Sequence, residues 1–273
     1  MKPMLADNIR KFPGNTADLC VEQKFDGERL VIEVCDNEVT GYNRKGNITN
    51  VPVNIAASFD NKGFSGHNNS WVFDGEVLAD KTYVVFDLLR VRGMDISGKP
   101  QQERRELLEI IAQRLNSPSI AVPPCVTGDK MQEFVERCME NRAEGVMFKN
   151  TKAPYRFNKR TKYFMKLKFV KTIDVVVKEV NRKGKDQGVS VGLYDSRKAD
   201  ALKFGLIEVG GCKIPEHMVG SIEEGDVLEL EYLYGTKANH IYQPIFLRIR
   251  TDEKDPFECT IDQLEITNKE IVS

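Results

Sequence analysis

The sequence predicts an α+β protein whose mostly antiparallel first part is followed by a smaller all-β part. Short segments rich in Val, Ile, Phe and Tyr, broken by Asp-Gly or Asn-containing turns, dominate the chain up to Phe169. Beyond Phe169, further strands follow with turns and almost no helix, which is typical of a small β-barrel. A chain of 273 residues also exceeds one typical domain. We therefore expect two domains, residues 1–170 and 171–273.

The expected elements follow from apolar spacing. Two segments, 103–115 and 129–141, carry apolar residues at helical spacing, and Asp129 is the expected N-cap of the second helix. The expected strands of the first part are residues 20–24, 28–34, 37–43, 70–73, 75–79, 82–89, 144–149 and 162–170. Those of the second part are residues 172–180, 190–194, 203–209, 227–234 and 244–251.

Composition indicates an ordinary globular protein. Hydrophobic residues make up 41% and charged residues 30%, and the formal net charge is −1. No apolar run approaches the roughly 18 residues of a membrane span, and the first residues lack the apolar core of a secretory signal, so we expect an intracellular, cytoplasmic protein without membrane association. The six cysteines are far apart with no C-x-x-C pair, which favours reduced thiols over a zinc site or a disulfide framework.

Charge is unevenly distributed along the chain. Nine Lys or Arg and no Asp or Glu lie between Lys149 and Lys171. Such a run is either a solvated loop or a surface that binds phosphates, because cations placed along a polyanion gain free energy by counterion release. Both interpretations remain open at this point.

The segment Lys24-Phe25-Asp26-Gly27-Glu28-Arg29 offers a candidate nucleophile between two expected strands. A lysine attacks only as the neutral amine, so its pKa must fall from about 10.4 through desolvation or nearby cations. Lys166 and Lys168 lie on one face of the strand 162–170 and could supply those cations. The plainer alternatives are a charged β-turn at Lys24 and an edge strand with solvated lysines at 162–170.

Two carboxylates recur beside glycine, in Asp74-Gly75-Glu76 and Glu144-Gly145. Each glycine could simply serve a turn. Alternatively, Glu76 and Glu144 project into a phosphate-rich cleft, where one accepts ribose hydroxyls and one helps to hold Mg²⁺. Lysines and carboxylates in one cleft are what nucleotidyl transfer needs, because that chemistry depends on positioning and charge stabilisation.

Taken in order, these segments resemble the motifs of the covalent nucleotidyltransferases: DNA ligases, RNA ligases and messenger-RNA capping enzymes. The resemblance implies an ATP-grasp-like nucleotidyltransferase domain followed by an OB-fold. It implies that Lys24 forms lysyl-AMP, with Asp26, Lys166 and Lys168 as further catalytic residues, and that Glu144 and Glu76 bind Mg²⁺ or Mn²⁺. The residues that it implies for the nucleotide are Glu22 at the adenine edge, Arg29, Arg44, Glu76 and Phe86, which stacks on the base.

The ending FLRIRTDEKDP resembles the last motif of the family, on the OB-fold, and implies Arg250, Asp252 and Lys254 as pyrophosphate-orienting residues. The usual R-x-D-K pattern is interrupted here by one residue before Lys254. The segment FMKLKF is similar to that of DNA ligases, whereas capping enzymes tend to carry tryptophan there and RNA ligases usually have a different C-terminal domain.

The resemblance therefore implies an ATP-dependent DNA ligase that joins nicks in duplex DNA through lysyl-AMP and a DNA-adenylate. The alternatives are an RNA ligase, a GTP-dependent capping guanylyltransferase and an inactive nucleic-acid-binding relative. We expect a monomeric minimal form without an N-terminal DNA-binding domain, since Met1 lies 23 residues before Lys24. The residues expected to hold nicked DNA are Lys152, Arg156, Lys159, Arg160, Lys162, Arg182, Lys183 and Lys185, with Arg197 and Lys198.

Overall fold

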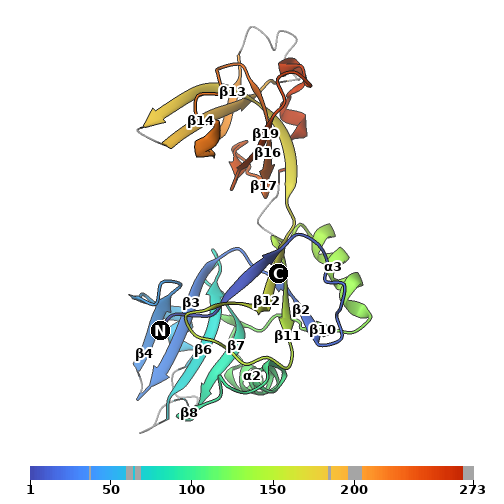
Figure 1. Cartoon of the computed structure of the whole chain (residues 1–273). Coiled ribbons are helices and arrows are strands. Elements are labelled where there is room, and N and C mark those ends of the chain that lie inside the picture. Colours follow the sequence, from blue (N-terminus) through green and yellow to red (C-terminus); the bar gives the residue numbers. More distant parts are fainter. Residues whose placement is uncertain (37, 60–63, 65–68, 184–185, 196–204, 267–273) are drawn as a thin grey trace. The chain divides into compact units, whose positions relative to one another are not determined.

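The computed structural model describes residues 1–36, 38–59, 64, 69–183, 186–195 and 205–266. It is mostly β with few helices, and the chain divides into two compact units, Met1–Lys168 and Phe169–Ser273 (Figure 1). This division falls two residues before the domain boundary expected from the sequence. Among the described residues, no helix is both long and apolar enough to cross a membrane.

The first unit contains a five-stranded sheet that carries most of the candidate catalytic residues. Strand β1 pairs in parallel with β12, and the other neighbours in this sheet are antiparallel. In spatial order the strands are β1 (Leu5–Ile9), β12 (Arg160–Lys168), β11 (Gly145–Asn150), β2 (Leu19–Lys24) and β10 (Val126–Thr127).

A seven-stranded sheet forms the other half of this unit. Its strands are, in order, β5 (Ile48–Thr49), β4 (Glu38–Asn43), β3 (Glu28–Cys35), β6 (Trp71–Val77), β7 (Tyr83–Val91) and β8 (Met94–Asp95), with β9 (Ile120–Ala121) parallel to β7. The expectation of two strands at 70–73 and 75–79 is wrong, because β6 runs through Asp74 and Gly75 without a turn. Both residues pair with β3, so Trp71 and Glu76 lie on one continuous strand.

Three helices accompany the sheets: α1 (Val53–Ala57), α2 (Gln101–Leu115) and α3 (Lys130–Glu140). The apolar periodicity located α2 and α3 within two residues, whereas α1 was not expected. Helix α2 packs against β7, and α3 packs against β2 and β10. Asp129 occupies the N-cap position of α3 as expected, although its side chain makes no capping hydrogen bond.

Alternation along β3 and β6 places apolar side chains on both faces of the seven-stranded sheet. Leu30, Ile32 and Phe73 belong to the cluster that also contains Leu108 of α2. Val31 and Val72 point the other way, into a second cluster with Met4, Leu89, Tyr155 and Phe164. Because Phe164 lies on β12, this second cluster holds the two sheets together. Asp74 and Glu76, two and four residues beyond Val72, share its side of β6.

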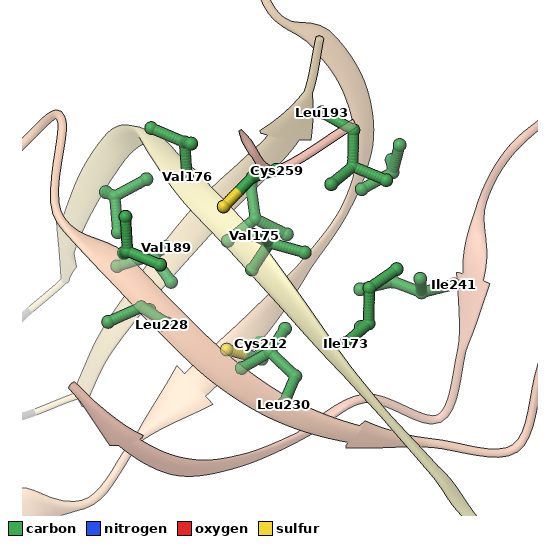
Figure 2. Packing of buried hydrophobic residues seen from close by; sticks show 14 of the residues in the cluster. Ile173, Val175, Val176, Val189, Leu193, Cys212, Leu228, Leu230, Ile241 and Cys259 are labelled. Carbon is green, nitrogen blue, oxygen red and sulfur yellow. The ribbon is translucent and has the colours of Figure 1, made fainter. Parts of the chain in front are cut away.

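The second unit is built on another antiparallel sheet, of order β15 (Ile207–Ile214), β14 (Asp186–Leu193), β13 (Lys171–Lys183), β16 (Val227–Tyr232) and β19 (Ile245–Ile249). A two-stranded sheet, β17 (Tyr234–Gly235) and β18 (Ile241–Tyr242), and the 3₁₀ turns Glu216–Met218, Pro256–Glu258 and Ile261–Gln263 complete the described part. Aliphatic side chains of β13, β14 and β16 converge on one core, which also buries Cys212 and Cys259 (Figure 2).

Gly145 is the tightest point of the five-stranded sheet. It pairs with Lys24 of β2 on one side and with Lys168 of β12 on the other. A Cβ atom at residue 145 would lie 2.2 Å from the carbonyl oxygen of Leu167. The glycine therefore permits a close approach between strands, which the turn interpretation of Glu144-Gly145 did not foresee.

We expect Gly145→Ala to lower the free energy of unfolding of the first unit by about 1–3 kcal/mol, because the added methyl forces the backbone apart. The measurement is urea unfolding followed by fluorescence of Trp71, the single tryptophan, which is buried in this unit. Gly98→Ala is the control, since a Cβ there meets nothing within 4 Å. Equal losses in the two variants would show that the close approach is not responsible.

Candidate active site

The strand register of the five-stranded sheet aligns the candidate catalytic residues in rows. Gly145 lies between Lys24 and Lys168, and the next row on the same face has Met147 between Glu22 and Lys166. Because side chains alternate along a strand, Glu22, Lys24, Lys166 and Lys168 all project from one face of this sheet. The absence of a side chain at Gly145 leaves the two lysines of its row free to approach a shared partner.

That face lines a cavity shared with the seven-stranded sheet, called here the central cavity. Its lining residues are Met4, Leu5, Ala6, Glu22, Gln23, Lys24, Phe25, Gly27, Arg29, Arg44, Glu76, Phe86, Met147, Lys149, Phe164 and Lys166. Seven residues chosen from the sequence are therefore brought together: Glu22, Lys24, Arg29, Arg44, Glu76, Phe86 and Lys166. The lining holds five cationic side chains and two carboxylates. This excess of positive charge suits an anionic ligand.

The Lys24 ammonium group is held by Glu144. It forms an ion pair with Glu144 Oε2 and donates a second hydrogen bond to the carbonyl oxygen of Phe25 at 3.2 Å. The other oxygen of Glu144 lies 3.2 Å from Lys168 Nζ. One carboxylate, only 4% exposed, thus bridges two lysines from the strands on either side of β11. This contact brings Glu144 and Lys168 to the candidate nucleophile.

Lys166 is partly buried and is surrounded by other cations. Burial lowers the pKa of Lys166 below its usual value, and the cations Lys168, Lys24, Arg44 and Arg160 lower it further. A cation held in this way would gain free energy from an anionic ligand placed beside it.

Arg29 is fixed on the opposite wall by a buried carboxylate. Its Nε and Nη2 atoms donate to the two oxygens of Asp74, each at 2.6 Å, and Asp74 has no exposed surface. The Tyr155 hydroxyl donates to the same carboxylate at 2.6 Å. The Arg29 guanidinium lies 4.7 Å from the centre of the Phe86 ring. Asp74 and Tyr155 thus support Arg29 and Phe86, a role that the strand pattern gave no reason to assign.

Lys149 was grouped with the basic run, but its position corrects that interpretation. Its side chain is 1% exposed, and its Nζ atom donates to Glu22 Oε2 at 2.6 Å and to the carbonyl oxygen of Phe86 at 2.9 Å. It is neither solvated nor part of a surface that could bind DNA. The available signal was its place in β11, two residues after Met147 and therefore on the face that holds Glu22.

Gly27 connects two of the candidate carboxylates: Asp26 precedes it in the sequence, and Glu76 accepts a hydrogen bond from its amide. Glu76 Oε1 accepts a hydrogen bond from the Gly27 amide at 3.1 Å, and the carboxylate lines the central cavity. Burial raises the pKa of Glu76, and Glu144 acts in the same direction, while Lys24, Arg29 and the Gly27 amide oppose the shift. Asp26 is half-buried in the turn between β2 and β3, outside the residues that line the cavity.

The donor set of the central cavity suits a hard cation. Glu76 lines the cavity and Glu144 contacts the lining residue Lys24; both offer carboxylate oxygens, and Mg²⁺ commonly binds one or two carboxylates together with substrate phosphates. Cys20, Glu22 and Cys125 also have donor atoms within 4.8 Å of one another. This second group does not fit Mg²⁺, because it presents two thiols, which are soft ligands that a hard cation does not prefer.

The candidates near the end of the chain belong to the second unit. Arg250 donates from Nη1 to both oxygens of Asp174, at 3.1 and 3.0 Å, and Lys254 Nζ lies 2.9 Å from Glu258 Oε2. Asp252 is exposed. Their roles in orienting pyrophosphate are taken up below as part of a proposal.

The remaining candidates form a cationic surface on the first unit. Arg156, Lys159, Arg160 and Lys162 are exposed and line a second, open cavity; they are called here the basic surface. Lys152 is exposed and forms an ion pair with Asp18 at 2.7 Å. Arg182 and Lys183 lie in β13, but their side chains are not described, and Lys185, Arg197 and Lys198 lie outside the described residues.

We expect Glu76→Gln to stabilise the folded protein at about pH 8 and to have a much smaller effect near pH 5. The raised pKa of Glu76 means that the folded protein holds this proton more tightly than the unfolded chain does. Folding stability is therefore lost as the pH rises above the ordinary value of 4.5, and glutamine avoids that loss. The measurement is the thermal midpoint at both pH values, with exposed Glu106→Gln as control. A destabilised Glu76→Gln at the higher pH would contradict this account.

The matched family model ends at residue 168, which is also the last residue of the first unit. Residues 80–168, which include β7, β11 and β12, match the family described as ATP dependent DNA ligase domain. Among solved structures, a Lig E DNA ligase has a TM-score of 0.64 at 18% identity over 90% of this chain and 99% of that one. The ligase domain of M. tuberculosis LigD has a TM-score of 0.54 at 21% identity over 95% of this chain and 97% of that one. At these identities the likeness concerns the fold.

Three curated relatives match between 40% and 87% of this chain. A DNA ligase of Nanoarchaeum equitans is 28% identical over 87% of this chain and 41% of its own length. The SPbeta prophage-derived DNA ligase-like protein LigB of Bacillus subtilis is 26% identical over 61% of this chain and 67% of its own length. A probable DNA ligase of Mycolicibacterium gilvum is 37% identical over 40% of this chain and 22% of its own length. The chain thus spans less than half of two of these three relatives. The family model and these relatives make the chain similar to ATP-dependent DNA ligases.

Proposed function

We propose that this protein joins nicks in duplex DNA with ATP, and that Lys24 carries the AMP group. The observation that carries the proposal is the arrangement around Lys24 Nζ. This amine lies in a cationic cavity, is held by Glu144, and has Lys166 and Lys168 on the same face of the sheet. A nucleophile within reach of several fixed cations is what attack on a polyphosphate requires.

In the first step, the neutral amine of Lys24 attacks the α-phosphorus of ATP. The Lys24 ammonium group first loses one proton to water; a nitrogen–phosphorus bond then forms as the bond to the β-phosphate oxygen breaks, pyrophosphate leaves, and the nitrogen loses a second proton to water. Lys166 and Lys168 stabilise the charge that develops on the phosphate oxygens. Mg²⁺ bound with Glu144 or Glu76 would supply further neutralisation of the phosphates. The role of Glu144 before this step is to hold the Lys24 amine in place.

The base of ATP would occupy the part of the cavity between Glu22 and Phe86. The Phe86 ring offers a stacking surface, and the Glu22 carboxylate offers an acceptor for the exocyclic amine of adenine. Lys149 joins these two side chains, because it donates to the Glu22 carboxylate and to the Phe86 carbonyl oxygen. Arg44, which is exposed at the cavity, is placed to contact a phosphate.

The later steps need DNA. AMP passes from Lys24 to the 5′-phosphate of the nick, and the 3′-hydroxyl then displaces AMP as the phosphodiester bond forms. The basic surface supports binding of duplex phosphates, since four exposed cations line one cavity. We propose that the first unit is an ATP-grasp-like nucleotidyltransferase domain, and that the second is an OB-fold whose Arg250, Asp252 and Lys254 orient pyrophosphate. A monomer acting on nicked DNA completes the proposal.

We expect the protein incubated with Mg²⁺ and α-labelled ATP to retain label on a denaturing gel, and Lys24→Ala to retain none. The reason is that the phosphoramidate needs the Lys24 amine, whereas Lys130→Ala, at the exposed start of α3, serves as the matched control and should label normally. Unlabelled nicked DNA should discharge the label. Label from GTP would indicate a capping enzyme, discharge by nicked RNA alone an RNA ligase, and no label an inactive relative.

Binding to nicked duplex should weaken steeply with salt, because phosphate contacts release counterions. We expect Arg156→Ala/Lys162→Ala to reduce the slope of log Kd against log salt by about two, one for each lost phosphate contact. The control, Lys130→Ala/Arg137→Ala on α3, removes the same charge elsewhere. The measurement is fluorescence anisotropy over a salt series. An unchanged slope in the first variant would remove the basic surface from the binding site.

A further inference from the structure

Two consecutive arginines of α2 are buried beside the central cavity although neither lines it. Arg104 has no exposed surface, and the Arg105 side chain is 8% exposed. A buried guanidinium is costly unless it is paired and its hydrogen bonds are satisfied. Both residues meet this condition through carboxylates that belong to the walls of the cavity.

Arg105 reaches the wall formed by the five-stranded sheet. Its Nη1 atom donates to Glu22 Oε1 at 3.1 Å, and its Nη2 atom donates to the carbonyl oxygen of Pro123. The Nε atom donates to Glu109 at 2.7 Å, one turn further along α2. Since Lys149 holds the other oxygen of Glu22, the carboxylate is fixed from two sides. Its direction toward the central cavity therefore depends on Arg105.

Arg104 reaches the wall formed by the seven-stranded sheet. Its Nε and Nη2 atoms donate to the two oxygens of Asp87 at 2.8 and 2.9 Å. Asp87 directly follows Phe86, and Phe86 is the extra residue of a β-bulge, because Asp74 pairs with Asp87 while Gly75 pairs with Val85. A bulge re-aims the side chain that it contains. Arg104 thus anchors the backbone that directs the Phe86 ring into the cavity.

Neighbouring residues of a helix point about 100° apart, so adjacent arginines can serve different elements. We infer that Arg104 and Arg105 are positioning residues that hold Phe86 and Glu22 in register across the cavity, and that Arg105 thereby sets the selectivity for adenine over guanine. This inference rests on the proposed function for the identity of the ligand. Neither arginine touches the ligand; each acts through the carboxylate that it binds.

The two arginines should differ in their effects. Stacking on Phe86 accepts any purine, so loss of the Arg104 anchor weakens ATP and GTP binding alike. Glu22 accepts the exocyclic amine of adenine and meets the carbonyl oxygen of guanine with an unfavourable contact. Loosening Glu22 through Arg105 therefore weakens ATP binding and relaxes discrimination against GTP.

The test is equilibrium binding of ATP and of GTP by calorimetry without Mg²⁺, so that AMP is not transferred to Lys24 and the heat reports binding alone. The variants are Arg105→Met, Arg105→Lys, Arg104→Lys, Glu22→Gln and the double variant Arg105→Met/Glu22→Gln, with exposed Arg114→Met of the same helix as control. We expect Arg105→Met to reduce the ratio of ATP to GTP affinity about tenfold, Arg105→Lys to recover part of it, and Arg104→Lys to leave the ratio unchanged while both affinities fall.

The double variant separates positioning from general destabilisation. If Arg105 acts through Glu22, the Arg105→Met change should not reduce the ratio further once Glu22 is glutamine. An unchanged ratio in folded Arg105→Met, or an equal further reduction in the double variant, would overturn the inference. Circular dichroism establishes folding, and Arg105→Lys decides the matter if the Met variant does not fold. Selective ATP binding by a chain that forms no lysyl-AMP would contradict the proposed function while leaving this inference intact.

Discussion

The stability of the first unit depends on ion pairs between charged side chains that are buried around its two sheets. Asp74, Asp87 and Arg104 are at most 2% exposed, and Glu22 and Lys149 are equally buried. Each has a partner of opposite charge within 3.1 Å. Removing one member of such a pair leaves a buried charge without compensation, which costs more than the pair itself contributes. The pairs therefore hold the side chains around the central cavity in one arrangement, while the apolar clusters hold the sheets together.

Geometry of the backbone makes those pairs possible. Gly145 lets β12 approach β11 closely, and the adjacent Glu144 carboxylate contacts Lys24 and Lys168 together. On the facing sheet, the bulge at Phe86 interrupts the alternation of β7. Side chains that are dispersed over more than a hundred residues of sequence thus reach one cavity through strand register. The loops add Phe25, Gly27 and Arg44 to the lining and supply Glu144.

Much of this could be predicted from the sequence, because strands and helices leave periodic apolar patterns. Helices α2 and α3 and most strands followed from such patterns, and seven residues chosen from the sequence line one cavity. The apolar pattern gave wrong predictions where contacts between distant residues determine the conformation or the burial of a residue. Asp74-Gly75 looks like a turn, yet pairing with β3 keeps it extended. Lys149 looks solvated, yet Glu22 lies close enough to bury it. No local signal distinguishes Arg104 and Arg105 from the other charged residues of an amphipathic helix.

The central cavity has a charge balance that differs from that of the whole chain. The whole chain is almost neutral, with forty basic and forty-one acidic residues, yet five cations and two carboxylates line this one cavity. Such an excess is unfavourable in the empty protein, as the lowered pKa of Lys166 indicates. A polyphosphate would reverse that penalty, since its charges face cations that are already desolvated and fixed. Repulsion between the cations lowers the stability of the folded protein, and binding of an anion removes that repulsion. A site for an anionic ligand is therefore expected to favour binding at the expense of folding stability.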